Sequence, residues 1–229
     1  MFRASRLLSV IGFAVLAACT DPNQLAKATL DNRLDTLTLY SLATAPLNRP
    51  SAYSLSAGTA VRTWDVGTNF DFAYSTDPAG KSVFLTLDVL GLASSSSVKP
   101  GLIRATSSFD AMTKAPLDGY VTSDTIVVAE QALFFLRTGI TTCHALGVPL
   151  YGKLEVLDID SVAQSVKIRV LADQNCGYRE LGLGIPKSGV AGTRLPPGRR
   201  RGGRPLLSKT WRIRPTRNSL SAPSGRYGS

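Results

Sequence analysis

Hydrophobic and polar residues alternate along much of the chain, and no long segment repeats its apolar residues with a helical period. Residues 83–89 carry aliphatic side chains at every second position, which is the period of a β-strand. Residues 150–156 and 166–170 show the same period, with charged residues between the apolar ones. The pattern predicts an all-β domain whose last two segments form a hairpin with one buried face and one charged face.

Turn sequences separate these predicted strands. Asp77-Pro-Ala-Gly80 stands ahead of residues 83–89, and its residue types are those that form tight turns. Residues 158–165 join the two strands of the hairpin. The carboxylates of Asp158 and Asp160 would suit a Ca²⁺ loop, but the position between two strands and the serine that follows favour a hairpin turn.

The hairpin also places opposite charges on one face. Glu155 belongs to its first strand, and Lys167 and Arg169 belong to its second. Side chains that face each other across an antiparallel pair lie about 5 Å apart. We therefore expect Glu155 to pair with one of these two basic residues.

Two parts of the chain resemble each other. Residues 35–39 (DTLTL) resemble residues 124–128 (DTIVV), and residues 57–63 resemble residues 132–138. In both parts a strand, a polar turn and another strand follow. We expect an antiparallel β-sandwich or small barrel of about eight strands. A duplicated four-strand unit is one interpretation of the similarity, and chance likeness among β-rich segments is the other.

The N-terminus has a different pattern. Arg3 and Arg6 precede an uncharged, mostly apolar run at residues 7–18. Positive charges followed by such a run are typical of an export signal. The run is shorter than the roughly 20 residues that a membrane-spanning helix needs. Residues 1–18 are therefore predicted to be a signal peptide.

The end of this run, Leu16-Ala17-Ala18-Cys19, resembles the lipobox of bacterial lipoproteins. The resemblance implies cleavage before Cys19 and lipidation of the Cys19 thiol, with everything after it outside the cytoplasm. Several acyl chains hold a protein durably, whereas a single chain binds only marginally. An ordinary secretory cleavage after Ala17 or Ala18 is the alternative. Thr20 replaces the aspartate that retains enterobacterial lipoproteins at the inner membrane, so the resemblance favours the outer membrane.

The cysteine count agrees with this interpretation. Three cysteines leave an odd one in an exported chain, and lipidation of Cys19 accounts for it. Cys143 and Cys176 remain, and in an oxidising compartment we expect them to form a disulfide. A metal site made of both cysteines and His144 is the competing interpretation, but it lacks a fourth strong ligand. We expect no metal and no cofactor.

The net charge of +10 belongs to the C-terminal part of the chain. Residues 188–229 contain ten basic and no acidic residues, whereas residues 1–187 contain 16 of each. Glycine and proline fill 12 of the last 42 positions, a composition typical of disorder. The tail is interpreted either as a disordered arm for an anionic envelope surface or as a reading-frame artefact. We expect no nucleic acid partner, although Trp211 and Tyr227 would suit stacking.

No catalytic constellation stands out. A Ser-His-Asp site would have to use His144, and the chain has no Gly-x-Ser-x-Gly. Loop carboxylates remain, and an envelope hydrolase is the alternative function if at least two of them converge in a cleft. These candidates are Asp110, Asp118, Asp124 and Asp158.

Two further groups of residues have structural interpretations. Asn175-Cys-Gly-Tyr-Arg179 is predicted to be a strand end with a tight glycine turn beside the disulfide, rather than a ligand site. Trp64, Phe70, Phe72 and Tyr74 are predicted to pack in the core and its rim, with the last three on one strand face, rather than to form a sugar platform.

The domain organisation follows from these boundaries. We expect a signal peptide (1–18), a tether (19–34), a β-domain (35–187) and a basic tail (188–229). The sequence predicts a non-enzymatic, lipid-anchored envelope protein whose β-domain has a binding or structural role.

Overall fold

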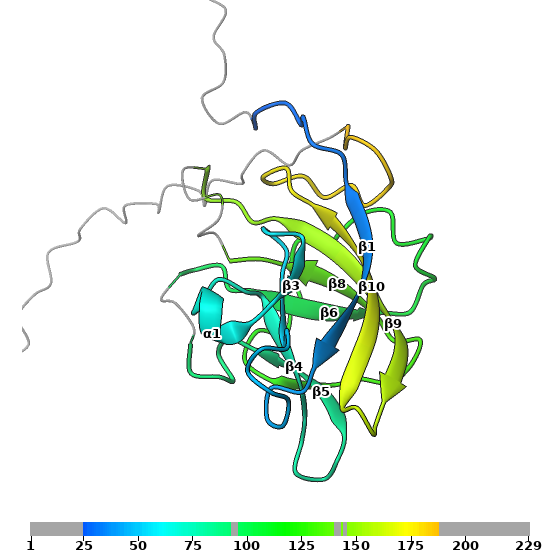
Figure 1. Cartoon of the computed structure of the whole chain (residues 1–229). Helices are drawn as coiled ribbons and strands as arrows, with labels where there is room; N and C mark the ends of the chain where they lie inside the picture. Colours follow the sequence, from blue (N-terminus) through cyan, green and yellow to red (C-terminus); the bar gives the residue numbers. More distant parts are fainter. Residues whose placement is uncertain (1–24, 93–95, 140–142, 144–145, 188–229) are drawn as a thin grey trace, which may run out of the picture. The chain divides into compact units, whose positions relative to one another are not determined.

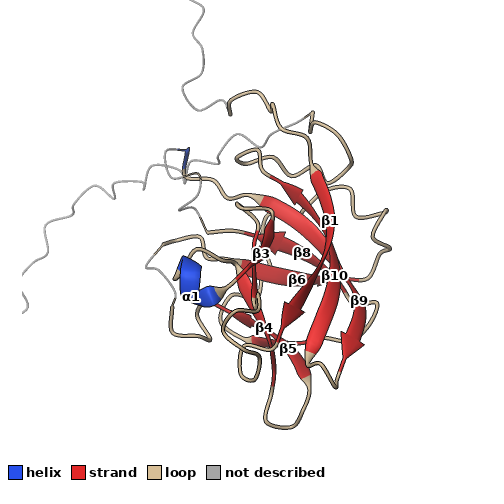
Figure 2. Ribbon diagram, in the orientation of Figure 1, coloured by secondary structure: helices blue, strands red, loops and turns tan. Residues whose placement is uncertain are grey.

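The computed structural model describes residues 25–92, 96–139, 143 and 146–187. The predicted signal peptide, Cys19, His144 and the basic tail lie outside the described residues, so the expectations for them remain predictions. The described chain is almost entirely β-structure, with one short helix (Figure 2).

Ten strands follow one another along the chain. They are β1 (Arg33–Tyr40), β2 (Ala52–Ser54), β3 (Thr59–Val61), β4 (Phe72–Thr76), β5 (Ser82–Thr86), β6 (Gly101–Ala105), β7 (Thr125–Val127), β8 (Leu133–Arg137), β9 (Tyr151–Asp160) and β10 (Ser165–Asp173). The single helix α1 (Thr63–Val66) lies between β3 and β4.

The strands form two antiparallel sheets of five. Their orders are β1-β10-β9-β8-β6, here the β10 sheet, and β3-β2-β4-β5-β7, here the β4 sheet. One buried hydrophobic cluster contains side chains of both sheets. Within it, the ring of Phe84 from the β4 sheet lies 5.8 Å from the ring of Phe134 from the β10 sheet. The predicted antiparallel β-sandwich is therefore confirmed, with ten strands where about eight were expected.

Strands β1 and β7, the first pair of similar segments, occupy equivalent places. β1 pairs with β10, the last strand of the second half, and β7 pairs with β5, the last strand of the first half. β1 thus joins the β10 sheet and β7 joins the β4 sheet, and Figure 1 shows the blue β1 beside the yellow β10. This arrangement agrees with a duplicated unit.

The second pair of similar segments does not fit that arrangement. Residues 57–63 contain β3, an edge strand that pairs only with β2. Residues 132–138 contain β8, which lies inside its sheet and pairs with β9. The place equivalent to β8 is taken by β2, which pairs with β4. Similarity of these two segments therefore does not mark equivalent strands.

The predicted hairpin is the β9–β10 pair. Arg169 donates to Glu155 across it at 2.5 Å, as expected. The Oδ1 atom of Asp160 accepts hydrogen bonds from the backbone N–H groups of Val162 (2.9 Å) and Ala163 (2.8 Å), so this carboxylate closes the turn. Asp158 lies within β9, opposite Lys167.

The first turn sequence also forms as predicted. Asp77 Oδ1 accepts from the N–H groups of Ala79 (2.9 Å) and Lys81 (2.8 Å). Gly80 has a φ of +79°, which a residue with a side chain rarely adopts. The turn therefore depends on both its aspartate and its glycine.

The aromatic residues near β4 correct one expectation. Phe72 and Tyr74 are buried in the core between the sheets, as predicted. Phe70 precedes the strand and packs with Leu87 in a separate cluster, so it does not share their face. Trp64 lies on α1 with 80% of its surface exposed, so its predicted packing is wrong.

One part of the charged face of the hairpin, around Lys153, is not open to solvent. Lys153 is only 3% exposed because the β6–β7 connection covers it. Its Nζ atom donates to the backbone oxygens of Phe109 (2.8 Å) and Met112 (3.0 Å) and lies 4.5 Å from the centre of the Phe109 ring. Phe109 also packs with Leu171 and Leu181 in a second, smaller core. Burial lowers the pKa of Lys153.

Replacing this lysine should loosen the connection over the sheet. Lys153→Met keeps most of the length of the side chain but removes two charge-assisted hydrogen bonds, each of about 1.5–3 kcal/mol. It also removes the cost of burying an ammonium group. We expect a net loss of about 1–2 kcal/mol in urea unfolding. Lys167→Met, on the exposed face of β10, is the matched control. Equal stability of the two variants would contradict this role for Lys153.

Candidate functional site

The disulfide lies at one end of the β10 sheet. Cys143 and Cys176 are bonded, with their Cα atoms 5.8 Å apart. The bond links the connection between β8 and β9 to the loop that follows β10. Cys143 is buried in the main core. The predicted pairing of the two cysteines is therefore present in the structure.

The loop after Cys176 makes the tight turn that the sequence predicted. Gly177 has a φ of +77°, and its N–H donates to the backbone oxygen of Pro149 at 3.0 Å. A Cβ atom at this position would lie 2.9 Å from the Leu25 side chain. The positive φ therefore favours glycine for the turn, whereas the tip of the Leu25 side chain could move away from a Cβ atom.

Two side chains of this loop hold the N-terminal segment. The Tyr178 hydroxyl accepts from the N–H of Ala28 (3.1 Å) and donates to the oxygen of Ala26 (3.1 Å). Asn175 Oδ1 accepts from the N–H groups of Thr29 (3.0 Å) and Leu30 (3.1 Å), and its Nδ2 donates to the oxygen of Leu30 (2.9 Å). We call these two side chains and residues 26–30 the N-terminal clamp.

Asn32, which follows the clamp in the chain, is held by the backbone of residues 180–184. Asn32 Nδ2 donates to the backbone oxygens of Glu180 (2.7 Å) and Gly182 (2.8 Å), and Asn32 N–H donates to Gly184 (3.0 Å). Figure 1 shows the blue N-terminal segment beside the gold C-terminal one. Residues 25–32, which the sequence assigned to the tether, are thus packed on the domain.

The buried carboxyl group of Asp173 is hydrogen-bonded to Asn175 of the clamp. Asp173 is fully buried, and its Oδ1 accepts from both the backbone N–H and the Nδ2 of Asn175 at 2.8 Å. Its Oδ2 has no partner among the described residues. Burial raises the pKa of Asp173 to about 6, against the opposing effect of its bonds to Asn175. The carboxyl therefore orients the asparagine that holds the N-terminal segment.

Loss of one hydroxyl should open the clamp locally. Tyr178→Phe removes the bonds to Ala26 and Ala28 but keeps the buried ring, so we expect a loss of about 1 kcal/mol in stability. Hydrogen exchange at the Ala28 amide should become faster, while exchange in β9 stays unchanged. Tyr40→Phe, a tyrosine outside the clamp, serves as the control. Unchanged exchange at Ala28 would contradict the clamp.

A cavity lies at another place, where several strand ends meet. Its volume is about 160 Å³, and it is lined by Ser54, Ser56, Thr68, Asn69, Phe70, Asp71, Leu87, Leu92, Pro100 and Gly139. These residues lie at the ends of β2, β5 and β8 and just before β4 and β6. Both sheets therefore contribute to the cavity.

The buried acid of this cavity is Asp71. It is 7% exposed, and its Oδ2 accepts from the N–H of Leu55 at 2.7 Å. Burial raises the pKa of Asp71 to about 7, only partly opposed by this hydrogen bond. A carboxyl group with such a pKa exchanges its proton near neutral pH.

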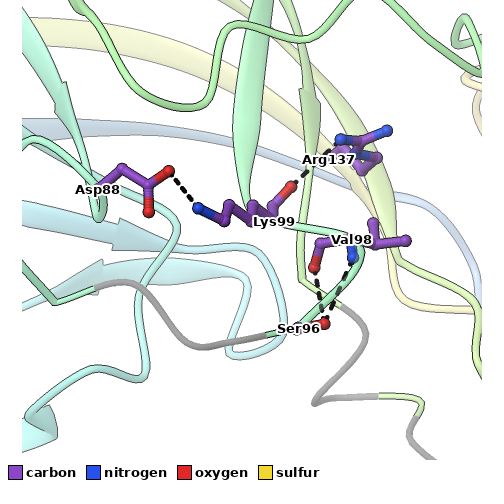
Figure 3. Close-up of polar contacts among 5 residues, drawn as sticks. All are labelled: Asp88, Ser96, Val98, Lys99 and Arg137. Atoms are coloured by element: carbon purple, nitrogen blue, oxygen red, sulfur yellow. Dashed lines mark hydrogen bonds and ion pairs between the residues drawn. The ribbon is translucent and has the colours of Figure 1, made fainter. Parts of the chain in front are cut away.

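A polar network holds the segment that precedes the lining residue Pro100 (Figure 3). Lys99, which precedes the lining residue Pro100, extends its Nζ to Asp88 Oδ2 at 2.6 Å. Arg137 donates to the backbone oxygen of Lys99 at 3.3 Å, and Ser96 accepts from and donates to the backbone of Val98. The ammonium group of Lys99 is therefore already paired with the carboxylate of Asp88.

The four candidate loop acids have different neighbours. Burial lowers the pKa of Lys153, and the charge of nearby Asp110 opposes this shift. Burial mainly raises the pKa of Tyr151, and Asp118 adds a smaller effect in the same direction. Asp124 accepts from the N–H that begins β7, and Asp158 faces Lys167 in the hairpin. Among the described residues, no three His, Cys, Asp or Glu side chains lie close enough to hold a metal ion.

Comparison with known proteins adds no assignment. The chain matches no protein-family model, and no curated protein matches it significantly. Within the ranges that the structure describes, no helix has the length and apolar character to cross a membrane.

Proposed function

We propose that the chain is a lipid-anchored protein of the bacterial envelope, whose β-domain has a binding or structural role at the membrane surface. The resemblance of Leu16–Cys19 to a lipobox supports the anchor. The observation that carries the proposal is the N-terminal clamp, because the segment nearest to Cys19 is held by side chains of the disulfide loop.

The clamp suits a domain that is held by its N-terminus. β1 is one of the two edge strands of the β10 sheet, and its neighbour in that sheet is β10. A pull on the free end of an edge strand would break its hydrogen bonds one pair after another. The clamp transfers such a pull to the loop at Cys176, which a covalent bond ties to the main core. The N-terminal end of β1 is thereby protected from peeling.

The clamp also sets how far the domain reaches from the lipid. Cys19 stands six positions before Leu25, the first described residue. A fully extended chain of this length spans about 20 Å. A lipid on Cys19 would therefore keep the domain close to the membrane, so its partner would be found at the membrane or in the layer next to it.

Substitution of the acylated residue tests the anchor. We expect Cys19→Ser to leave the membrane fraction or to accumulate as the uncleaved precursor, because serine offers no thiol for the lipid. The measurement is the share of protein in the detergent phase after a high-salt wash, which removes electrostatic attachment.

Thr20→Ala is the matched control, because it changes the next position and keeps the cysteine. It should stay with the membrane and be processed like the natural chain. A natural chain that partitions into water with an unmodified Cys19 would refute the proposal.

A further inference from the structure

The cavity around Asp71 contains a negative group without a cation. None of the cavity's described lining residues is lysine, arginine or histidine, and none of the ion pairs in the described part of the chain includes Asp71. Lys99 lies next to the lining residue Pro100, but its ammonium group is bonded to Asp88. The carboxylate of Asp71 thus lacks a partner of opposite charge.

Only one oxygen of this carboxylate takes part in a hydrogen bond within the described part of the chain. Asp71 Oδ2 binds the N–H of Leu55, whereas Oδ1 has no hydrogen-bond partner among the described residues. Asp71 itself is more than nine-tenths buried. The carboxylate therefore has one hydrogen-bond donor, the Leu55 N–H, and lines the cavity without an opposite charge among the described residues.

A neutral side chain could make the one hydrogen bond that Asp71 makes within the described fold. The bond to Leu55 needs only an acceptor, which the amide oxygen of an asparagine would supply without charge. Burial of the ionised carboxylate is unfavourable, as its raised pKa indicates. Ionisable groups kept at such a cost are characteristic of binding and catalytic sites.

We propose that this cavity binds the primary ammonium group of a small aliphatic amine, with Asp71 as its counter-ion. An ammonium group has three N–H donors. Asp71 would accept one, and the side-chain oxygens of Thr68 and Asn69 in the lining would accept others. The apolar side chains of Phe70 and Leu87 in the same lining would contact the carbon chain.

The size of the cavity limits the ligand. Its volume of about 160 Å³ equals roughly five water molecules at about 30 Å³ each. A short amine with about five non-hydrogen atoms would fill it. A divalent metal fits less well, because Ca²⁺ takes 6–8 oxygen ligands and Asp71 is the single carboxylate among the described lining residues.

The amide of Leu55 provides a direct readout, because it donates to Asp71. In the detergent-solubilised full chain, the NMR shift of this amide should follow the ionisation of Asp71 as pH rises. Since a bound cation favours the charged carboxylate, n-butylamine hydrochloride at saturation should lower the midpoint by at least about one pH unit. n-Butanol, tetramethylammonium and sodium chloride should leave the midpoint unchanged.

Asp71→Asn should lose both the titration of the Leu55 amide and at least about 90% of the affinity for n-butylamine, which corresponds to a tenfold weaker site. The proposal is overturned if n-butylamine does not move the midpoint in the natural chain. It is also overturned if tetramethylammonium, which has no N–H donor, moves the midpoint equally. Both outcomes are read on the natural chain, so they do not depend on the folding of a variant.

Discussion

Loss of the Cys143–Cys176 bond should lower the free energy of unfolding by about 3–4 kcal/mol. The bond closes a loop between residues 33 positions apart, and removal of such a cross-link returns this much conformational entropy to the unfolded chain. For a domain of this size the melting temperature should fall by roughly 10 °C. The measurement is thermal unfolding of the Cys143→Ala/Cys176→Ala variant beside the natural chain.

Chemical reduction supplies the control for this variant. Reductant should lower the melting temperature of the natural chain and have no effect on the double variant. Both thiols should resist alkylation until reductant is added. A double variant as stable as the natural chain would show that the bond contributes nothing to the fold.

Replacement of Asp71 by asparagine should stabilise the domain above neutral pH. The pKa of Asp71 is raised from 3.8 to about 7 in the folded chain. Between these values the folded state holds a proton that the unfolded state has lost, so stability falls as pH rises. A shift of this size corresponds to about 4 kcal/mol when complete. Asparagine cannot ionise, so the Asp71→Asn variant should not lose stability in this way. At pH 8 it should have a larger free energy of unfolding than the natural chain.

Urea unfolding at several pH values measures this difference. The advantage of Asp71→Asn should shrink as pH falls toward 4, where the unfolded chain also binds the proton. Asp173, with its pKa raised to about 6, should leave a smaller decline of stability with pH in the variant. Asp65→Asn, at a half-exposed acid of α1, is the control and should behave like the natural chain. An advantage of Asp71→Asn that is independent of pH would contradict burial of the ionised carboxylate.

The strands were predictable where the signal is local. The β9–β10 hairpin follows from a period of two and a polar turn. The sequence limits the partner of Glu155 to Lys167 or Arg169, and the register of the two strands selects Arg169. Burial of Lys153 was not predictable in this way. Alternation shows which residues share a face of a sheet, but Phe109 and Met112, which cover that face, are more than 40 residues away along the chain.

In the candidate sites, too, contacts between residues far apart in the chain were not predictable from the sequence. Cysteine count alone suggested the disulfide, and the residues around Cys176 were distinctive enough to predict a turn. The partners of Asn175 and Tyr178 lie about 150 residues earlier, so the clamp has no local signature. Asp71 stands between two aromatic residues, Phe70 and Phe72. That neighbourhood was a signal of burial, but only the fold shows that no cation accompanies the carboxylate in its cavity.

The lipid on Cys19 is the feature on which the proposed function depends, and the intact mass of the mature protein tests it most directly. Protein extracted with detergent from native envelopes should begin at Cys19 and carry the added mass of a diacylglyceryl group. A protein that begins at Ala18 or Cys19 without added lipid mass, and that is recovered in the aqueous phase, would contradict membrane anchoring.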